Sequence, residues 1–152
     1  MANPFPFVVG QVLTAAEMNG IGEAAVSFTP TFSGYTRGNG TSVAYYMRVN
    51  KLVYVYVQET LGSTSSVTGG IIMTLPFAAT RLQAIMPTRA RIDQTGANVL
   101  FGTVVPASTT TFQMLADTAG GTYVAFAATS ATVPITWGNT DKFAFGAVYE
   151  AA

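Results

Sequence analysis

The chain has 152 residues, enough for one domain with a buried core, and 49% of them are hydrophobic whereas only 9% are charged. Seven basic and seven acidic side chains give a net charge of zero, which argues against the positive surface that holds nucleic-acid phosphates. No apolar run approaches the roughly 20 residues of a membrane-spanning helix, so the sparse charge predicts a soluble oligomer whose subunits cover part of one another's surface.

The N-terminal segment, residues 1–12, combines two prolines with several large apolar side chains. Proline has no backbone N–H and fixes an extended conformation, so this composition predicts an arm. Its principal apolar side chains are Phe5, Phe7, Val8 and Val9. An extended apolar strip contacts much foreign surface per residue, so we interpret the arm as an anchor on a neighbouring protein. The alternative is that the arm folds back on its own domain.

A short helix is expected to follow the arm. Thr14-Ala15-Ala16-Glu17 has the Ser/Thr-x-x-Glu form of a capping box, and Leu13 and Met18 flank it as a possible hydrophobic staple. Two glycines interrupt the pattern within two turns, and helices this short are marginal in water. We therefore expect Leu13 and Met18 to pack on a partner surface together with the arm.

The most informative stretch is a predicted hairpin with strands at Val43–Val49 and Leu52–Thr60, joined tightly at Asn50-Lys51. Side chains alternate between the two faces of a strand. In the second strand, one face carries Val53, Val55 and Val57, and the other carries Leu52, Tyr54 and Tyr56. A strand that is apolar on both sides has one face on its own core and the other against another layer, another subunit or an aromatic-rich surface. We therefore place Tyr54 and Tyr56 at an interface.

Further strands are predicted along most of the remaining chain. They lie at Ser27–Phe32, Gly70–Leu75, Ala84–Ile92, Asn98–Val105, Thr109–Leu115, Thr122–Ala127, Val133–Thr136 and Lys142–Tyr149. Turn signals separate them, at Arg37–Gly40, Gly62–Ser66, Asp93–Gly96, Asp117–Gly121 and Gly138–Asp141. This cadence predicts an all-β fold, an antiparallel β-sandwich of jelly-roll type over residues 27–152, preceded by an anchoring arm and short helix over residues 1–26.

Catalysis is the poorest fit to the residue types present. The chain has no His and no Cys, so histidine- and cysteine-based nucleophilic and metal sites are absent, and we expect no catalytic, metal-binding or cofactor-binding residues. Carboxylate chemistry remains, as in a polysaccharide-degrading enzyme that pairs Glu59 with Asp117 or Asp141. Each of these acids is expected at a strand end or in a turn, where a solvated carboxylate is the ordinary finding.

Two patterns allow a carbohydrate interpretation. Several tyrosines and Trp137 could form a platform that stacks on sugar rings, and Trp137, beside Asn139, is the aromatic residue least committed to a core; aromatic residues on strands more often fill cores or subunit contacts. Asn39-Gly40-Thr41 fits the N-glycosylation pattern, but Asn-Gly is also a turn dipeptide, and we favour the turn.

Two groups of motifs resemble parts of tailed-bacteriophage virion proteins. The first, from Phe7 to Asn19, is similar to the opening of many fibre and minor tail proteins, with an aromatic residue, Gly, Val-Leu-Thr-Ala-Ala and Met/Leu-Asn. The other group resembles the β-domain that often follows this opening. Its motifs are Phe28-Thr29-Pro30-Thr31-Phe32-Ser33-Gly34-Tyr35, Gly38-Asn39-Gly40-Thr41, Val49-Asn50-Lys51-Leu52-Val53, Gly62-Ser63-Thr64-Ser65-Ser66-Val67-Thr68-Gly69 and Leu75-Pro76. Together they lie within residues 5–78, about half of the chain.

This resemblance implies a structural, trimeric surface component of the virion without catalytic residues. The chain lacks the repeats of long fibres, which favours a compact component. We therefore expect a homotrimeric capsid decoration or cement protein, made in the host cytoplasm, located in the virion and anchored by its arm to the major capsid protein or to tail proteins. The alternative is a tail or fibre-tip protein that binds host cell-surface glycan, with Trp137 and Asn139 as contacts.

Overall fold

The computed structural model describes Gly10, Val12 and residues 24–120 and 122–152. Most of the expected arm and helix, and with them the anchoring role of residues 1–26, lies outside the described residues. The same holds for the anchoring candidates Phe5, Phe7, Val8, Val9, Leu13 and Met18, whose role stays a prediction.

The described residues form an all-β, antiparallel structure, as predicted. Eleven strands belong to one sheet, and a single 3-10 turn, η1 (Leu82–Ala84), lies among them. The strands are β1 (Val26–Ser27), β2 (Phe32–Thr36), β3 (Thr41–Val49), β4 (Leu52–Thr60), β5 (Ser66–Thr74), β6 (Ile85–Pro87), β7 (Arg89–Asp93), β8 (Val99–Ser108), β9 (Thr111–Gly120), β10 (Tyr123–Ala128) and β11 (Lys142–Glu150).

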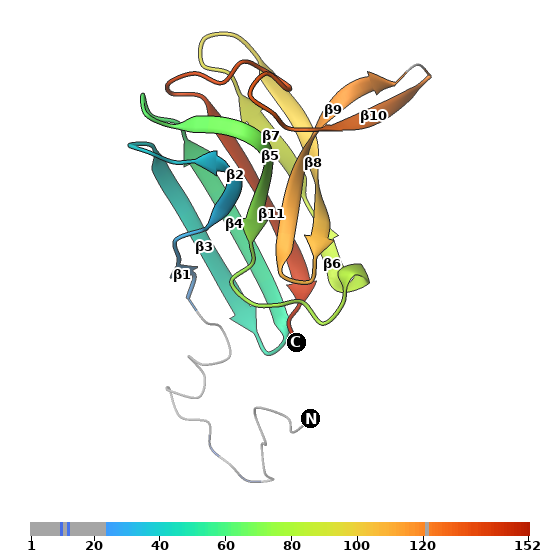
Figure 1. The fold of residues 1–152 in the computed structure, drawn as a ribbon. Coiled ribbons are helices and arrows are strands. Elements are labelled where there is room, and N and C mark those ends of the chain that lie inside the picture. Colours follow the sequence, from blue (N-terminus) through green and yellow to red (C-terminus); the bar gives the residue numbers. More distant parts are fainter. Residues whose placement is uncertain (1–9, 11, 13–23, 121) are drawn as a thin grey trace.

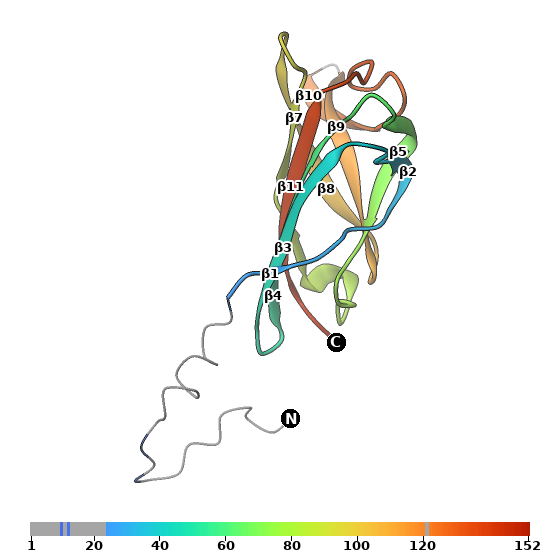
Figure 2. The same ribbon diagram turned by 90° about the vertical axis from the view of Figure 1, so that its left-hand side faces the viewer.

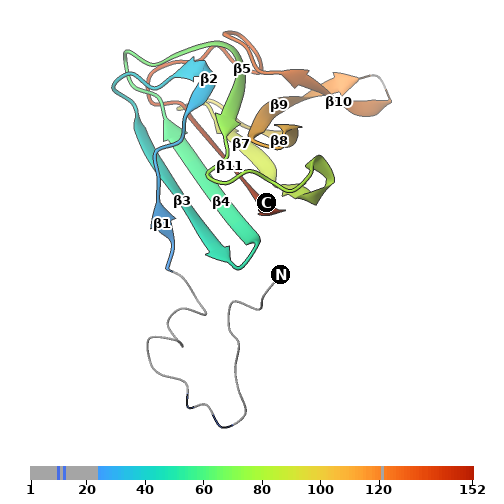
Figure 3. The ribbon, with the colours of Figure 1, turned by 60° about the horizontal axis from the view of Figure 1, so that its bottom comes forward.

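The sheet curls until its two ends face each other (Figure 1). Its strand order is β1-β3-β4-β11-β7-β8-β9-β5-β2, with β6 paired to β11 and β10 paired to β9. Figure 2, a side view, shows β3, β4, β11 and β7 in one wall and β2 and β5 in the other, and Figure 3 shows the same curl from another side. This half-barrel is consistent with the predicted β-sandwich, whereas the jelly-roll connectivity stays a prediction.

The core fills the space between the two walls. Val53, Val55 and Val57 of β4 point into it and are at most 1% exposed. The fully buried ring of Phe143 in β11 joins the walls, because it packs edge-on against Phe32 and Tyr35 of β2, with ring centroids 5.9 and 5.1 Å away.

Several strand boundaries differ from the sequence prediction. The segment Val133–Thr136 is not a strand and makes only a single bridge, between Ser130 and Val133, because Pro134 has no N–H to donate to a ladder. For the same reason the expected strand Ser27–Phe32 is interrupted around Pro30, and only its ends belong to β1 and β2.

Two further boundaries were wrong on the C-terminal half. The expected turn Asp117–Gly121 lies largely inside β9, since β9 stays paired with β10 as far as Gly120. The expected strand Ala84–Ile92 is divided into β6 and β7 around Thr88, whose side-chain hydroxyl accepts the Gly146 N–H at 2.9 Å.

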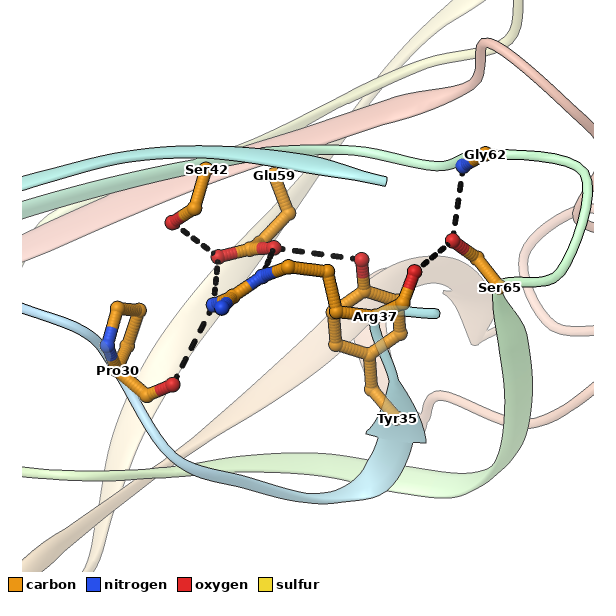
Figure 4. A network of polar contacts seen from close by, with 7 residues as sticks. All are labelled: Pro30, Tyr35, Arg37, Ser42, Glu59, Gly62 and Ser65. Carbon is orange, nitrogen blue, oxygen red and sulfur yellow. Dashed lines mark hydrogen bonds and ion pairs between the residues drawn. The ribbon is translucent and has the colours of Figure 1, made fainter. Parts of the chain in front are cut away.

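The predicted turn at Arg37–Gly40 links the two ends of the sheet, and a buried ion pair holds it (Figure 4). The Arg37 guanidinium donates to both carboxylate oxygens of Glu59, at 2.7 and 2.8 Å. The same carboxylate accepts the hydroxyl of Ser42 at 2.5 Å and that of Tyr35 at 3.3 Å. Glu59 is completely buried, so these donors take the place of the water molecules that would hydrate an exposed carboxylate.

Loss of the Glu59 carboxylate is expected to destabilise the fold strongly. Glu59→Ala leaves the partly buried Arg37 guanidinium and two hydroxyls without their acceptor, and we expect a loss of about 3–5 kcal/mol in the free energy of unfolding. Ser42→Ala removes one of several donors to the charged carboxylate and should cost less, about 1.5–3 kcal/mol. Urea unfolding of both variants checks this ranking, and equal losses would contradict the proposed role of the ion pair.

We expect two buried tyrosines to lower the stability of the fold at alkaline pH. Burial, and then the Glu59 carboxylate, raise the pKa of Tyr35 to about 12, and burial raises the pKa of Tyr149 to about 12. The unfolded chain loses these protons near pH 10, so stability is fully present below about pH 10 and falls as the pH rises towards 12. Unfolding measured across this range should show the fall, with a shallower slope in Tyr149→Phe. A slope that this substitution leaves unchanged would contradict the assignment.

Candidate interaction surface

The side of β4 that faces away from the core is part of a second apolar surface. Tyr54 and Tyr56 alternate with the buried valines and are only partly exposed. On the neighbouring strand β3, Met47 lies opposite Tyr54 and Tyr45 lies opposite Tyr56. Cross-strand partners point to the same side of a sheet, so both strands share this face. The predicted two-sided hairpin is thus confirmed.

The strand register carries this outer face across most of the sheet. In β11, Gly146 lies opposite Tyr56, and Ala144 lies opposite Arg91 of β7. Arg91 in turn lies opposite Phe101 of β8. Following the register through β9 places Phe126 of β10, which lies opposite Asp117, on the same side. The outer face therefore runs from β3 to β10.

Exposed apolar side chains concentrate on this face. In the described part of the chain, the exposed large apolar residues of the outer face are Val43, Met47, Val49, Leu52, Met86, Val99, Phe101, Val124 and Phe126. Those elsewhere are Val12, Val26, Leu82 and Tyr123. Nine of the thirteen thus share one side of one sheet, although exposed apolar side chains are commonly scattered singly.

Tyrosines line the centre of the outer face. The ring of Tyr45 lies 5.2 Å from that of Tyr56 and 6.3 Å from that of Tyr54, measured between centroids. Burial, followed by the neighbouring Tyr45, raises the pKa of Tyr54 above its usual value. That Tyr54 and Tyr56 form an interface stays a prediction.

A groove follows β11 between these tyrosines and the arginines of β7. We call it the tyrosine–arginine groove and define it by Tyr54, Tyr56, Arg89, Arg91, Ala144 and Gly146. Two adjoining hollows of about 240 and 320 Å³ make it up, and they share Tyr56, Arg91 and Ala144. The groove exists because Ala144 and Gly146, the outward residues of β11 between these tyrosines and arginines, are small.

Ion pairs hold Arg89 and Arg91, the two arginines on one side of the groove. The guanidinium of Arg89 lies 2.5 Å from the Asp117 carboxylate, and that of Arg91 lies 3.2 Å from the Asp93 carboxylate. The guanidinium carbon of Arg89 also lies 5.8 Å from the centroid of the Phe101 ring. The arginine side chains remain more than half exposed, so these pairs position them without removing them from solvent.

The candidate catalytic carboxylates have separate structural contacts. The expectation of solvated acids is wrong for Glu59, held by Arg37, and for Asp141, which is 4% exposed and accepts the N–H groups of Thr95 and Gly138. The prediction was wrong for both because a position near a strand end or in a turn says little about burial. Asp117 lies within β9 rather than in a turn, and it pairs with Arg89.

The candidate glycan residues lie apart from the groove residues defined above. The indole N–H of Trp137 donates to the Ser130 carbonyl at 2.9 Å, and its ring packs edge-on against Phe143. Trp137, expected to be the aromatic residue least committed to a core, is thus partly buried and packs against the core. Asn139 is exposed in the loop before β11. Their contact with glycan stays a prediction that this geometry does not favour.

Two negative findings concern the residues that the structure describes. No helix there has the length and apolar character needed to cross a membrane. No group of three or more acidic side chains gathers there in a way that could hold a metal ion.

Comparisons with known proteins found no family for this chain. No protein-family model matches it, and neither the curated proteins nor the solved structures gave a significant match.

The sequence prediction missed Arg89, Arg91 and Phe101 as parts of this surface. A signal was present, because Arg89, Arg91 and Asp93 alternate with the buried residues Ala90 and Ile92. This period-two pattern marks an outward face, but only the strand register shows that it lies next to Tyr56 across β11.

Gly146 is expected to be essential for the floor of the groove. A Cβ at this position would lie 2.5 Å from the backbone oxygen of Val55, which belongs to a paired strand and cannot move freely. We expect Gly146→Ala to cost about 1–3 kcal/mol in the free energy of unfolding. The matched control is Gly69→Ala, where the nearest atom is 3.9 Å away. Thermal unfolding of both variants checks the difference, and equal stability would argue against it.

Proposed function

We propose that this chain is a non-enzymatic structural protein of a tailed-bacteriophage virion, a capsid decoration or cement protein that assembles with copies of itself as a homotrimer. The observation that carries the proposal is the outer face, on which nine exposed apolar side chains gather. The motifs of residues 5–78 that resemble phage virion proteins support the place of assembly.

The size of the outer face favours an association between protein subunits. Its nine apolar side chains are 39% to 66% exposed. At these exposures each leaves on the order of 100 Å² open, so together they leave roughly 900 Å² of apolar surface, distributed around the curled sheet. A standard interface buries ~800 Å² on each partner, so in a closed oligomer different neighbours would cover different parts of this surface. A second copy of the chain is therefore the occupant that we assign to this face.

Composition supports the same assignment. Aromatic residues, Met and Arg are enriched at subunit interfaces, whereas Lys and Glu are depleted. Tyr54, Tyr56, Phe101, Met86 and Arg91 of the outer face follow this pattern, whereas Lys142 and Glu150 of β11, on the same face, do not. The low charge of the whole chain agrees with a surface that is partly covered after assembly.

The contacts of the acidic residues support a role without catalysis. Glu59, Asp141 and Asp117 each contact a different structural partner, although Oδ1 of Asp117 is buried without a hydrogen bond; the two carboxylates of a glycosidase instead face each other across the scissile bond. The proposed action is mechanical: apolar area buried between neighbours stabilises the assembly by roughly 25 cal/mol per Å², before the entropic cost of association is subtracted.

Recognition of host-surface glycan by a tail or fibre-tip protein is the second candidate. The observation that favours it is the tyrosine wall of the groove, because aromatic faces stack on sugar rings. Binding of the purified protein to a glycan array, lost in Tyr56→Ala, would favour this candidate over self-assembly.

The assembly proposal is tested by charge placed on the outer face. Met86→Asp combined with Phe101→Asp puts two carboxylates into the proposed interface, whereas Leu82→Asp puts one on an exposed apolar residue outside it. Light scattering after size-exclusion chromatography should show a trimer for the parent and for Leu82→Asp, and a monomer for the double variant. A monomeric parent, or equal behaviour of both variants, would refute self-assembly through this face.

The virion assignment needs a separate measurement. Locating the chain in a reconstruction of the intact particle tests it directly. Absence of the chain from purified particles would contradict the assignment even if the protein is trimeric.

A further inference from the structure

A two-stranded ribbon extends beyond the body of the sheet. The strand β9 pairs with β8 as far as Ala116, and its remaining residues, 117–120, pair with β10. Figures 1 and 3 show this β9–β10 ribbon projecting away from the two walls. We call this part, residues 117–120 and 122–126, the ribbon. Its side chains cannot contribute much to the core of their own chain.

The ribbon nevertheless carries large apolar side chains. Tyr123 is 81% exposed, the highest value among the aromatic residues that the structure describes, and Val124 and Phe126 are 66% and 55% exposed. Val124 and Phe126 continue the outer face, whereas Tyr123 lies opposite Gly120 on the other side of the ribbon. An aromatic side chain held this far from its own core is suited to contact another molecule.

The tyrosine–arginine groove has the chemistry and the size to accept an aromatic ring. One side of the groove is lined by Tyr54 and Tyr56, against which a guest ring can pack in an offset or edge-on arrangement. The other side of the groove carries the exposed guanidinium groups of Arg89 and Arg91, which attract the face of an aromatic ring. Hollows of about 240 and 320 Å³ exceed the volume of a single aromatic side chain.

We propose that Tyr123 of one copy inserts into the tyrosine–arginine groove of the next copy. This inference rests on the proposed self-assembly and specifies its contact. Both halves of the contact belong to the same chain, so each copy can insert one ribbon and accept another. The ribbon and the groove are different surfaces, so the contact is heterologous, and a rotation that closes after three copies gives the proposed trimer.

Cysteine cross-linking tests the contact directly, because the chain has no cysteine of its own. Thr122→Cys places a thiol beside Tyr123, and Lys142→Cys places one at the edge of the groove; both positions are exposed. A short bis-maleimide reagent should join these two single variants when they are mixed. The chain that carries both thiols should give a covalent three-chain species on a denaturing gel.

The control pairs Thr122→Cys with Leu82→Cys, which is exposed but lies outside the groove. A high yield for this pair, or a dominant cross-link between two Thr122→Cys chains, would overturn the proposed contact. If cross-linking fails while light scattering still shows a trimer, the ribbon contact is wrong and self-assembly stands. A monomeric parent would overturn both.

Substitutions at Tyr123 provide a second readout. Tyr123→Ala removes the ring at a solvent-exposed position, where folding should not suffer, and we expect self-association to weaken by about 30-fold. Tyr123→Phe keeps the ring and should associate within about threefold of the parent. Sedimentation velocity over a concentration series measures both, and equal weakening by the two variants, or none in Tyr123→Ala, would contradict insertion of the ring.

Discussion

The alternation of valine and tyrosine along β4 is the constraint on which the rest of the structure depends. Because successive side chains point to opposite sides, Val53, Val55 and Val57 enter the core while Tyr54 and Tyr56 face outward. One strand thus supplies part of the core and part of the outer face. A shift of one residue in register would bury the tyrosines and expose the valines, so folding and surface chemistry are specified by the same pairing.

The curl of the sheet makes this arrangement possible, and two contacts maintain it. The Phe143 ring joins the walls through apolar packing, while the Arg37–Glu59 ion pair joins the turn before β3 to the end of β4. A buried ion pair contributes little net stability compared with apolar packing, but its loss leaves an uncompensated charge. Its position at the junction of the sheet ends suggests that it selects one closed geometry among several that apolar packing alone would allow.

Sequence reasoning was most successful where the signal is local. The boundaries of β4 were predicted correctly because its alternation is strong, and Asn50, with a φ of 55°, accepts the left-handed turn that joins it to β3. Reasoning failed where tertiary contacts decide: Val133–Thr136 has the composition of a strand but is not one. The packing of Trp137 on Phe143 likewise depends on tertiary contacts that the sequence does not show. The tyrosine–arginine groove could not be predicted, since β4, β11 and β7 become neighbours only through pairings between distant segments.

The place of β11 in the sheet order also affects how the domain is made. This strand is the last of the eleven in sequence, yet it lies in the middle, between β4 and β7. During synthesis on the ribosome, β4 and β7 therefore emerge well before the strand that joins them. Until β11 arrives, each has an open edge and uncovered valine or isoleucine side chains, the features that make incompletely folded β-proteins prone to aggregate.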